Sequence, residues 1–342
     1  MKNYFKKAIY PLSIIVSFFM AFSLFYNSNN LSVYAKSKEL TAGKKNEGVP
    51  IIQYKDKLIF YSKSKKSIVI MKKLSVIRNI HINLSKYDGS FSYVKAYDKN
   101  NIYMLKNDTI YKLNLKSYHF SVYRKLSAPK KNYNELEHVV IDKSGVVWCA
   151  WDGYETENHD SYLVNSQGYK KRFDDIGYRI SLGLDYNGNL VYIFPVNRYI
   201  YKYSLYRHYK GSFKKYALNS HGINTIDDFN ISKDNKLYII GCDMDDEGGR
   251  TAYYNKFKIK SNSISKISTQ DLGDYGALLS DYCAVMDVKN NLWLLRNGSI
   301  YMSNGKKIVK KYTTSKKFYY LSVYDDKNLA AFNDNGKYAI AK

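Results

Sequence analysis

A single phrase recurs along the chain from residue 50 onward. It consists of an apolar run, a polar turn rich in Asp, Asn or Gly, and a second run with an aromatic residue near its start. The clear copies span residues 138–148, 184–192, 231–238 and 285–293. The weaker copies span residues 54–59, 97–103 and 324–330. Equivalent positions are separated by 44, 45, 43, 47, 55 and 37 residues, and they are Ile59, Tyr103, Trp148, Val191, Tyr238, Trp293 and Ala330.

This period predicts the fold class. Four short strands need about 40 to 45 residues, which is the length of one blade of a β-propeller. Asp, Asn and Gly suit the turn between the first two strands, because Asp and Asn side chains satisfy nearby backbone amides and Gly tolerates positive φ. In the second copy we expect strands at residues 92–97, 102–106, 109–115 and 117–126. The sequence therefore predicts an all-β chain forming a single β-propeller of about seven four-stranded blades.

The last copy reaches the end of the chain at its third strand, with residues 336–342. A closed ring needs a fourth strand in that blade, because an open sheet edge exposes unpaired backbone groups. We expect residues 37–47 to supply it, so that an N-terminal strand closes the last blade. The predicted organisation is a signal peptide at 1–35 and one propeller at 36–342.

The first 35 residues have the pattern of an export signal. Lys2, Lys6 and Lys7 precede an apolar stretch at 8–26, and Val33-Tyr34-Ala35 ends in the small residue that a signal peptidase prefers. We expect cleavage after residue 35 and a secreted or cell-surface protein. The alternative is a single uncleaved membrane anchor, because the apolar stretch approaches the roughly 20 residues that span a bilayer.

The net charge indicates the class of partner. The full chain carries +24 at pH 7, and the leader holds three lysines and no acid, which leaves +21 on residues 36–342. Such an excess attracts polyanions. For an exported chain we expect anionic cell-envelope polymers or a membrane surface rather than nucleic acid. The alternative interpretation is that the charge serves solubility alone.

The acids are concentrated on one predicted face. In a propeller the connections between the second and third strands, and those from one blade to the next, emerge on the same side. We expect this acidic face to bind a cation, a protein segment or a glycan, and the candidate ligand-binding residues are Asp152, Glu155, Glu157, His159, Asp160, Asp174, Asp175, Asp227 and Asp228. Paired carboxylates on this face also fit the alternative of a lyase or glycoside hydrolase.

One acidic loop resembles the start of a calcium-binding loop. Asp243, Asp245 and Glu247 occupy alternate positions before Gly248, and Ca²⁺ binds several carboxylate oxygens at such spacing. Tyr254 stands where the last, bidentate glutamate of that pattern belongs. A solvated acidic loop is therefore the alternative to a Ca²⁺ site here.

Two copies of the repeat carry a wider resemblance. The phrases at 142–148 and 287–293, each beginning with Asp and ending with Trp, resemble the blade repeat of two-component-regulator propellers and, more loosely, of NHL repeats. The resemblance implies a sensor or binding module, although lyases also occur among such propellers. It carries over no catalytic residue to this chain.

Recognisable catalytic motifs are lacking in the sequence. It has no His-x-x-x-His pair, no Cys-x-x-Cys, no Gly-x-Ser-x-Gly and no glycine-rich phosphate loop. We therefore interpret the chain as an exported binding or scaffold propeller that is held by its basic surface to anionic envelope polymers. The alternatives are a propeller enzyme and a membrane-anchored extracytoplasmic sensor.

Overall fold

The computed structural model describes residues 38–39, 41–42, 48–62, 64–72, 75–82, 91–129, 135–152, 160–173, 180–197, 201–244, 250–274, 282–296, 298–303, 307–314, 318, 320–332 and 338–340. Regular structure within these residues is β-strand throughout. No helix in the described part of the chain has the length and apolar character needed to cross a membrane. The predicted signal peptide lies outside the described residues.

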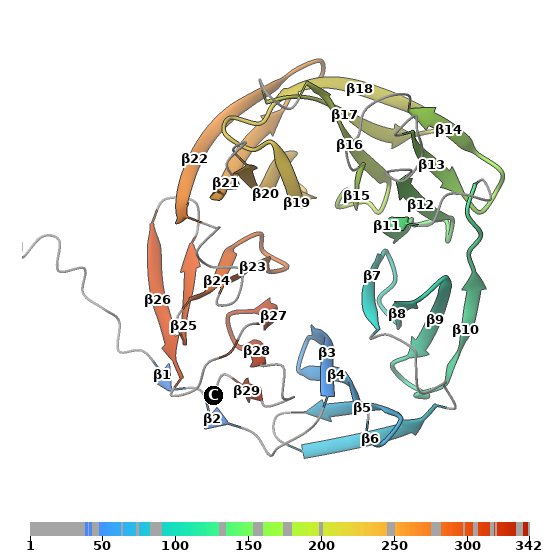
Figure 1. Cartoon of the computed structure of the whole chain (residues 1–342), viewed down its shortest axis with the longest axis vertical. Helices are drawn as coiled ribbons and strands as arrows, with labels where there is room; N and C mark the ends of the chain where they lie inside the picture. The colour runs from blue at the N-terminus through green and yellow to red at the C-terminus, as the bar shows by residue number, and fades with distance from the viewer. Residues whose placement is uncertain are drawn as a thin grey trace, which may run out of the picture.

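The strands form seven blades around a central axis, as Figure 1 shows. Blade 1 contains β3 Gly48–Tyr54, β4 Lys57–Ser62, β5 Ser67–Lys72 and β6 Ser75–His81. Blade 2 contains β7 Ser92–Ala96, β8 Asn101–Lys106, β9 Thr109–Asn114 and β10 Phe120–Lys125. Blade 3 contains β11 Glu135–Ile141, β12 Val147–Asp152, β13 Ser161–Asn165 and β14 Lys170–Phe173.

The remaining blades follow in chain order. Blade 4 contains β15 Ser181–Leu184, β16 Leu190–Asn197, β17 Lys202–Tyr209 and β18 Ser212–Asn219. Blade 5 contains β19 Thr225–Ile231, β20 Lys236–Met244, β21 Arg250–Ile259 and β22 Ile264–Asp274. Blade 6 contains β23 Tyr282–Met286, β24 Leu292–Arg296, β25 Ser299–Ser303 and β26 Ile308–Thr313. Blade 7 contains β27 Tyr320–Asp325, β28 Asn328–Phe332 and β29 Tyr338–Ile340.

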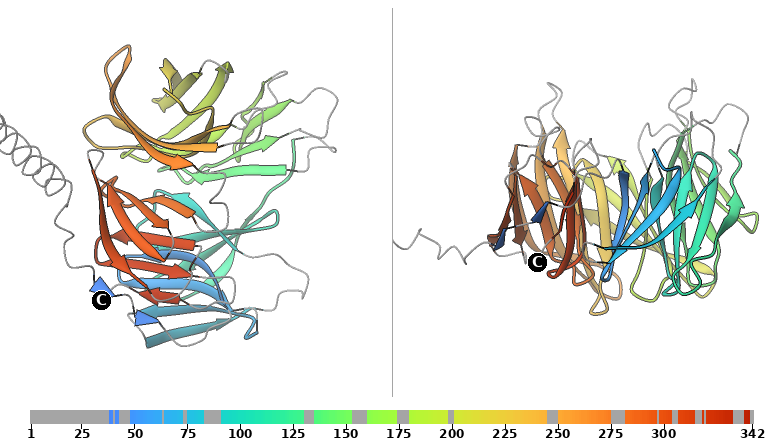
Figure 2. Two further views of the ribbon diagram at one scale, coloured as in Figure 1. Left: turned by 60° about the vertical axis from the view of Figure 1, so that its left-hand side comes forward. Right: turned by 90° about the horizontal axis from the view of Figure 1, so that it is seen from below.

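These blades confirm the fold predicted from the repeat. Within each blade the strands pair in chain order and antiparallel, and the first strand is innermost (Figure 1). The side views in Figure 2 show the sheets standing next to one another around the ring. The four strands predicted in the second copy match β7 to β10 to within three residues at each end. The unequal repeat spacing also has a structural origin: blade 5 has the longest strands, with 9 residues in β20, 10 in β21 and 11 in β22.

The N-terminal segment closes the ring, as predicted. Strand β2 Thr41–Ala42 pairs antiparallel with β29, with Thr41 opposite Ile340, and so becomes the fourth strand of blade 7. The preceding strand β1 Lys38–Glu39 pairs parallel with β26 of blade 6, with Lys38 opposite Tyr312. The sequence did not indicate this second pairing. Both N-terminal strands lie beside the C-terminal end of the chain in Figure 1.

The hydrophobic core lies between neighbouring sheets. Strand β12 shows how it is built, because all of its residues are buried and alternate residues face different blades. Trp148 and Ala150 pack in a cluster with residues of blade 4, such as Leu182. Val147 and Cys149 pack in a cluster with residues of blade 2. Each sheet is thus apolar on both faces, which requires a neighbour on either side and favours a ring.

Deletion of residues 36–47 tests the closure of the ring. The deletion removes β1 and β2 and leaves β26 and β29 as open edges. Four residue pairs are lost, and at about 1 kcal/mol for one backbone hydrogen bond per pair the loss of stability is on the order of 4 kcal/mol, with a fall in Tm of several degrees. Thermal unfolding of residues 36–342 and of the deletion variant checks this. An unchanged Tm would show that the N-terminal strands do not stabilise the ring.

Candidate functional site

A buried carboxylate closes the turn between the first two strands of a blade. In blade 6, Asp287 Oδ1 accepts hydrogen bonds from the amide nitrogens of Lys289 at 2.8 Å and Asn291 at 2.9 Å. Asp287 Oδ2 accepts one from Trp293 Nε1 at 2.9 Å, and Trp293 is fully buried. Asp142 in blade 3 makes the equivalent contacts with its own turn and with Trp148. The Asp and Trp of the repeat phrase therefore bond to each other and fix the turn.

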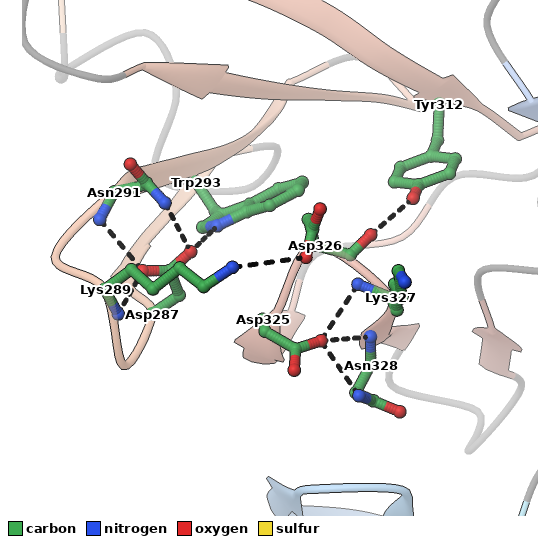
Figure 3. Close-up of polar contacts among 9 residues, drawn as sticks. All are labelled: Asp287, Lys289, Asn291, Trp293, Tyr312, Asp325, Asp326, Lys327 and Asn328. Atoms are coloured by element: carbon green, nitrogen blue, oxygen red, sulfur yellow. Dashed lines mark hydrogen bonds and ion pairs between the residues drawn. The ribbon is translucent and has the colours of Figure 1, made fainter.

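Figure 3 shows this turn beside the equivalent turn of blade 7. Asp325 Oδ1 accepts hydrogen bonds from the amide nitrogens of Lys327 at 2.9 Å and Asn328 at 3.0 Å. Lys289 Nζ lies 3.9 Å from Asp326 Oδ1, so an ion pair bridges the two blades. The backbone carbonyl of Asp326 accepts a hydrogen bond from the Tyr312 hydroxyl at 2.8 Å.

Other blades use variants of the same turn. Burial alone would raise the pKa of Asp98 in blade 2, but hydrogen bonds from Asn101, the Asn100 amide and Tyr103 outweigh it and lower that pKa. In blade 4 the guanidinium Nε of Arg207 lies 2.7 Å from Asp185 Oδ2. The turn carboxylates are therefore engaged in hydrogen bonds and ion pairs within the fold.

Neighbouring turns are bonded to one another around the ring. Lys143 N donates to Gly188 O at 2.8 Å, which joins blades 3 and 4, and Val288 N donates to Tyr324 O at 3.1 Å, which joins blades 6 and 7. Further contacts on this face join Tyr54 with Lys99, Tyr97 with Ile141, Asp185 with Ile231, Asn230 with Asn290, and Tyr54 with Tyr324. The face is consequently a continuous, fixed surface.

Lysines dominate this surface, which we call the turn face. Antiparallel pairing places the turns between strands one and two at the same end of a blade as those between strands three and four. The inner turns, next to the axis, carry the exposed side chains Lys55, Lys99, Lys143, Lys233, Lys289 and Lys327. The outer turns and their flanks carry the exposed side chains Lys72, Lys116, Lys210, Lys260 and Lys307.

Few acids offset these lysines. The outer-turn segments 115–119, 166–169, 210–211 and 260–263 contain no Asp or Glu. Apart from the Asp residues that accept hydrogen bonds from the turn amides, the described acids of the inner turns are Asp56, Asp234 and Asp326. Each of these three forms an ion pair with a lysine. Exposed acids gather instead toward the opposite face, at Asp108, Glu135, Asp227, Asp228 and Asp271.

A central channel passes between the two faces. Its cavity has a volume of about 620 Å³, and residues from the first strand of every blade line it. Lys95 from blade 2 and Asp228 from blade 5 face each other across it, with Lys95 Nζ 3.7 Å from Asp228 Oδ1 and 3.1 Å from Phe229 O. Tyr93 contacts channel solvent but is surrounded by protein, and this desolvation raises the pKa of Tyr93 to about 12.

The described acidic-face candidates fall in three environments. Asp160 is buried, and Arg172 contacts both of its carboxylate oxygens, at 2.9 and 3.1 Å. Asp152 is buried, and its Oδ1 accepts a hydrogen bond from Ser161 Oγ at 3.5 Å. Asp227 and Asp228 line the channel. The structure thus brings Asp227 and Asp228 to one cavity and engages Asp160 in a structural ion pair.

The other candidates lie outside the described residues. They are Glu155, Glu157, His159, Asp174, Asp175, Asp245 and Glu247. Of the three calcium candidates only Asp243 is described, and its Oδ2 accepts a hydrogen bond from the Tyr201 hydroxyl at 2.9 Å. In the part of the chain that the structure describes, no group of three or more His, Cys, Asp or Glu side chains is arranged to hold a metal ion.

The candidate residues from the sequence did not include the turn-face lysines, although a repeated lysine position indicates them. A lysine directly follows the capping residue in Asp98-Lys99, Asp142-Lys143 and Ser232-Lys233. In Asp287-Val288-Lys289 and Asp325-Asp326-Lys327 it follows one residue later. A repeated position with one charge in successive blades becomes a ring of that charge once the propeller closes.

Solved structures similar to this chain are propellers of diverse function. Virginiamycin B lyase from Staphylococcus aureus is 10% identical over 88% of this chain and 97% of its own, with a TM-score of 0.55. The Pan2 WD40 domain of Neurospora crassa is 13% identical over 92% of each chain, with a TM-score of 0.52. YCF48, solved bound to a D1 peptide, is 10% identical over 91% of this chain and all of its own, with a TM-score of 0.51. These likenesses show the β-propeller fold alone.

The sequence matches no protein-family model and no curated protein.

Replacement of Asp287 by Ala tests the carboxylate turn. The change leaves two turn amides and the buried Trp293 N–H without their acceptor, and we expect the free energy of unfolding to fall by about 2 to 4 kcal/mol. Replacement of the exposed Asp326 by Ala in the adjacent blade is the control, with an expected change within about 0.5 kcal/mol. Urea denaturation followed by tryptophan fluorescence measures both. Equal effects of the two replacements would contradict the structural role of Asp287.

Proposed function

We propose that the protein is an exported binding propeller that attaches to anionic polymers of the cell envelope through its turn face. The observation that carries this proposal is the double ring of exposed lysines on that face. Inner-turn lysines come from six blades, and the acids interspersed with them are already paired. An extended array of one charge sign binds a polyanion because many weak contacts act together.

We base export on the leader at 1–35, which has the pattern of a signal peptide. In this proposal the remaining chain, with a charge of +21, acts outside the cytoplasm. Anionic polymers and membrane headgroups are the polyanions available there, and nucleic acid is not an expected partner. The resemblance of the turn phrase to two-component-regulator and NHL propellers agrees with a binding or sensing role.

The opposite face supplies a second surface in this proposal. It carries exposed acids and the channel entrance with Asp227 and Asp228. While the turn face is attached to the envelope, the acidic face points away and presents carboxylates to a basic protein segment, a cation or a glycan. We prefer this scaffold role to an enzyme, because Lys95 in the channel pairs with Asp228 and donates a hydrogen bond to the Phe229 carbonyl.

The electrostatic basis of the proposal predicts a strong dependence on salt. Binding of residues 36–342 to poly(glycerol phosphate) is expected to weaken at least about tenfold between roughly 50 and 500 mM NaCl, because the Debye length falls from about 14 to 4 Å. Biolayer interferometry on immobilised polymer measures the Kd at each salt concentration. A Kd that stays constant over this range would exclude attachment through the lysine rings.

The acidic face has its own test in the calcium hypothesis. If Asp243, Asp245 and Glu247 hold Ca²⁺, calorimetric titration of residues 36–342 gives saturable heat, and the Asp243→Ala/Asp245→Ala variant loses it. The Tyr201→Phe variant is the control, since it removes the hydrogen bond to Asp243 and keeps every carboxylate. Absence of heat with the wild type, or unchanged heat with the double variant, would identify this segment as a solvated acidic loop.

A further inference from the structure

The inner part of the turn face has the features of a defined site rather than a diffuse charge. We infer that it binds a phosphodiester-linked chain of sugars or polyols at the mouth of the channel. This inference rests on the proposed attachment to anionic polymers and specifies where and how the polymer is recognised. Three observations carry it, and they are the unpaired lysines, an adjoining hollow with amide and aromatic groups, and the rigidity of the turns.

The lysines supply the phosphate contacts. Of the described inner-turn lysines, Lys289 pairs with Asp326 and Lys55 lies over the ring of Tyr54. The other four, Lys99, Lys143, Lys233 and Lys327, are exposed and form neither an ion pair nor a ring contact. They come from blades 2, 3, 5 and 7 and therefore stand at intervals around the channel mouth. A lysine ammonium binds phosphate as a point charge without fixed geometry. Charges spaced around an opening suit the regularly spaced phosphates of a flexible chain.

A hollow on the same face supplies contacts for the groups between phosphates. It has a volume of about 730 Å³, and its lining includes Tyr186, Asn230, Lys233 and Asn290. The side chain of Asn230 donates to that of Asn290, which holds both amides in place. Amides hydrogen-bond to hydroxyl groups, and the exposed ring of Tyr186 can pack against the C–H face of a sugar or polyol. Lysine can therefore contact the phosphates, while the amides and the aromatic ring contact the hydroxylated units between them. This combination fits a polymer in which phosphates alternate with sugars or polyols.

The turns are already fixed before any ligand binds. Lys143 N is held by Gly188 O of the next blade. The ring of Tyr97 lies against Gly188, whose φ is +76° and where an added Cβ would stand 2.3 Å from Tyr97 Cγ. Ordering of the backbone therefore costs little on binding, and preorganised contacts convert into affinity.

The geometry favours a soluble or wall-bound polymer over a bilayer. Bilayer attachment by a protein surface combines basic residues with large apolar side chains that insert among the lipids. The lysines of the turn face instead surround a hollow and a channel mouth, and the exposed large hydrophobic side chains in that lining are Tyr186 and Val288. A chain can enter the hollow, whereas a flat bilayer contacts only its rim.

Two matched lysine sets test the inference. The ring variant replaces four inner-turn lysines by Ser, namely Lys99, Lys143, Lys233 and Lys327. The control variant replaces by Ser four exposed lysines that lie outside the inner turns, namely Lys65, Lys125, Lys214 and Lys266. Both sets remove four charges, so long-range attraction falls equally. We expect the Kd for poly(glycerol phosphate) to rise at least about tenfold in the ring variant and about twofold in the control. Thermal unfolding confirms that both variants fold.

A third variant tests recognition of the hydroxylated units. Tyr186→Ser is expected to weaken binding of poly(glycerol phosphate) about threefold and to leave binding of inorganic polyphosphate unchanged, because polyphosphate has no carbon face for the ring. Equal weakening for both polymers would overturn the assignment of the hollow to these units.

The outcomes separate this inference from the proposed function. If the wild type binds neither polymer, attachment to anionic polymers itself is wrong. If the wild type binds but the ring and control variants weaken equally, attachment stands and the inner-ring site is overturned. A third outcome is that phosphatidylglycerol vesicles bind the wild type but not the ring variant, whereas poly(glycerol phosphate) binds neither protein. The ligand is then the lipid headgroup, and the polymer assignment is wrong.

Discussion

The propeller depends on the hydrogen bonds that its turn carboxylates accept. In Asp142 and Asp287 one oxygen takes two backbone amides and the other takes the indole N–H of a buried Trp. Burial of these acids is tolerable because every oxygen has a donor, and the acid in turn satisfies amides that a tight reversal leaves unpaired. Each turn is thereby held in one conformation, which lets neighbouring turns bond to each other. A local interaction repeated in successive blades becomes a rigid face of the whole ring.

Closure of the ring brings the two ends of the chain into contact. An open ring would expose an apolar sheet face of blade 1 and of blade 7 to solvent, so these two blades pack against each other. Gln53 N donates to Ser322 Oγ at 2.7 Å across this junction, and β2 completes blade 7 from the N-terminal side. The contacts join residues separated by about the whole length of the chain. Such long-range pairing carries a larger loop-closure cost than the pairing of neighbouring strands within a blade.

The sequence was sufficient for the architecture because the architecture is local and repeated. The period gave the blades, and the missing fourth strand in the last copy indicated N-terminal closure. It was insufficient for the site, since a side chain's partner there comes from another strand of the blade. Arg172 neutralises Asp160, and Arg207 binds Asp185, and neither pairing follows from spacing. The parallel pairing of β1 with β26 was equally unpredictable, because two residues carry no strand signal of their own.

The same repetition explains how charge is separated in this molecule. In five blades an Asp caps the turn after the first strand, and the residue that follows this Asp is exposed. Lysine at that position, as in Lys99 and Lys143, places an exposed cation next to a capping carboxylate. The carboxylate charge is directed into the sheet and screened by amide dipoles, whereas the ammonium reaches solvent on a long stem. A polyanion approaching from outside therefore meets cations first, and the fold-stabilising acids do not repel it at contact distance.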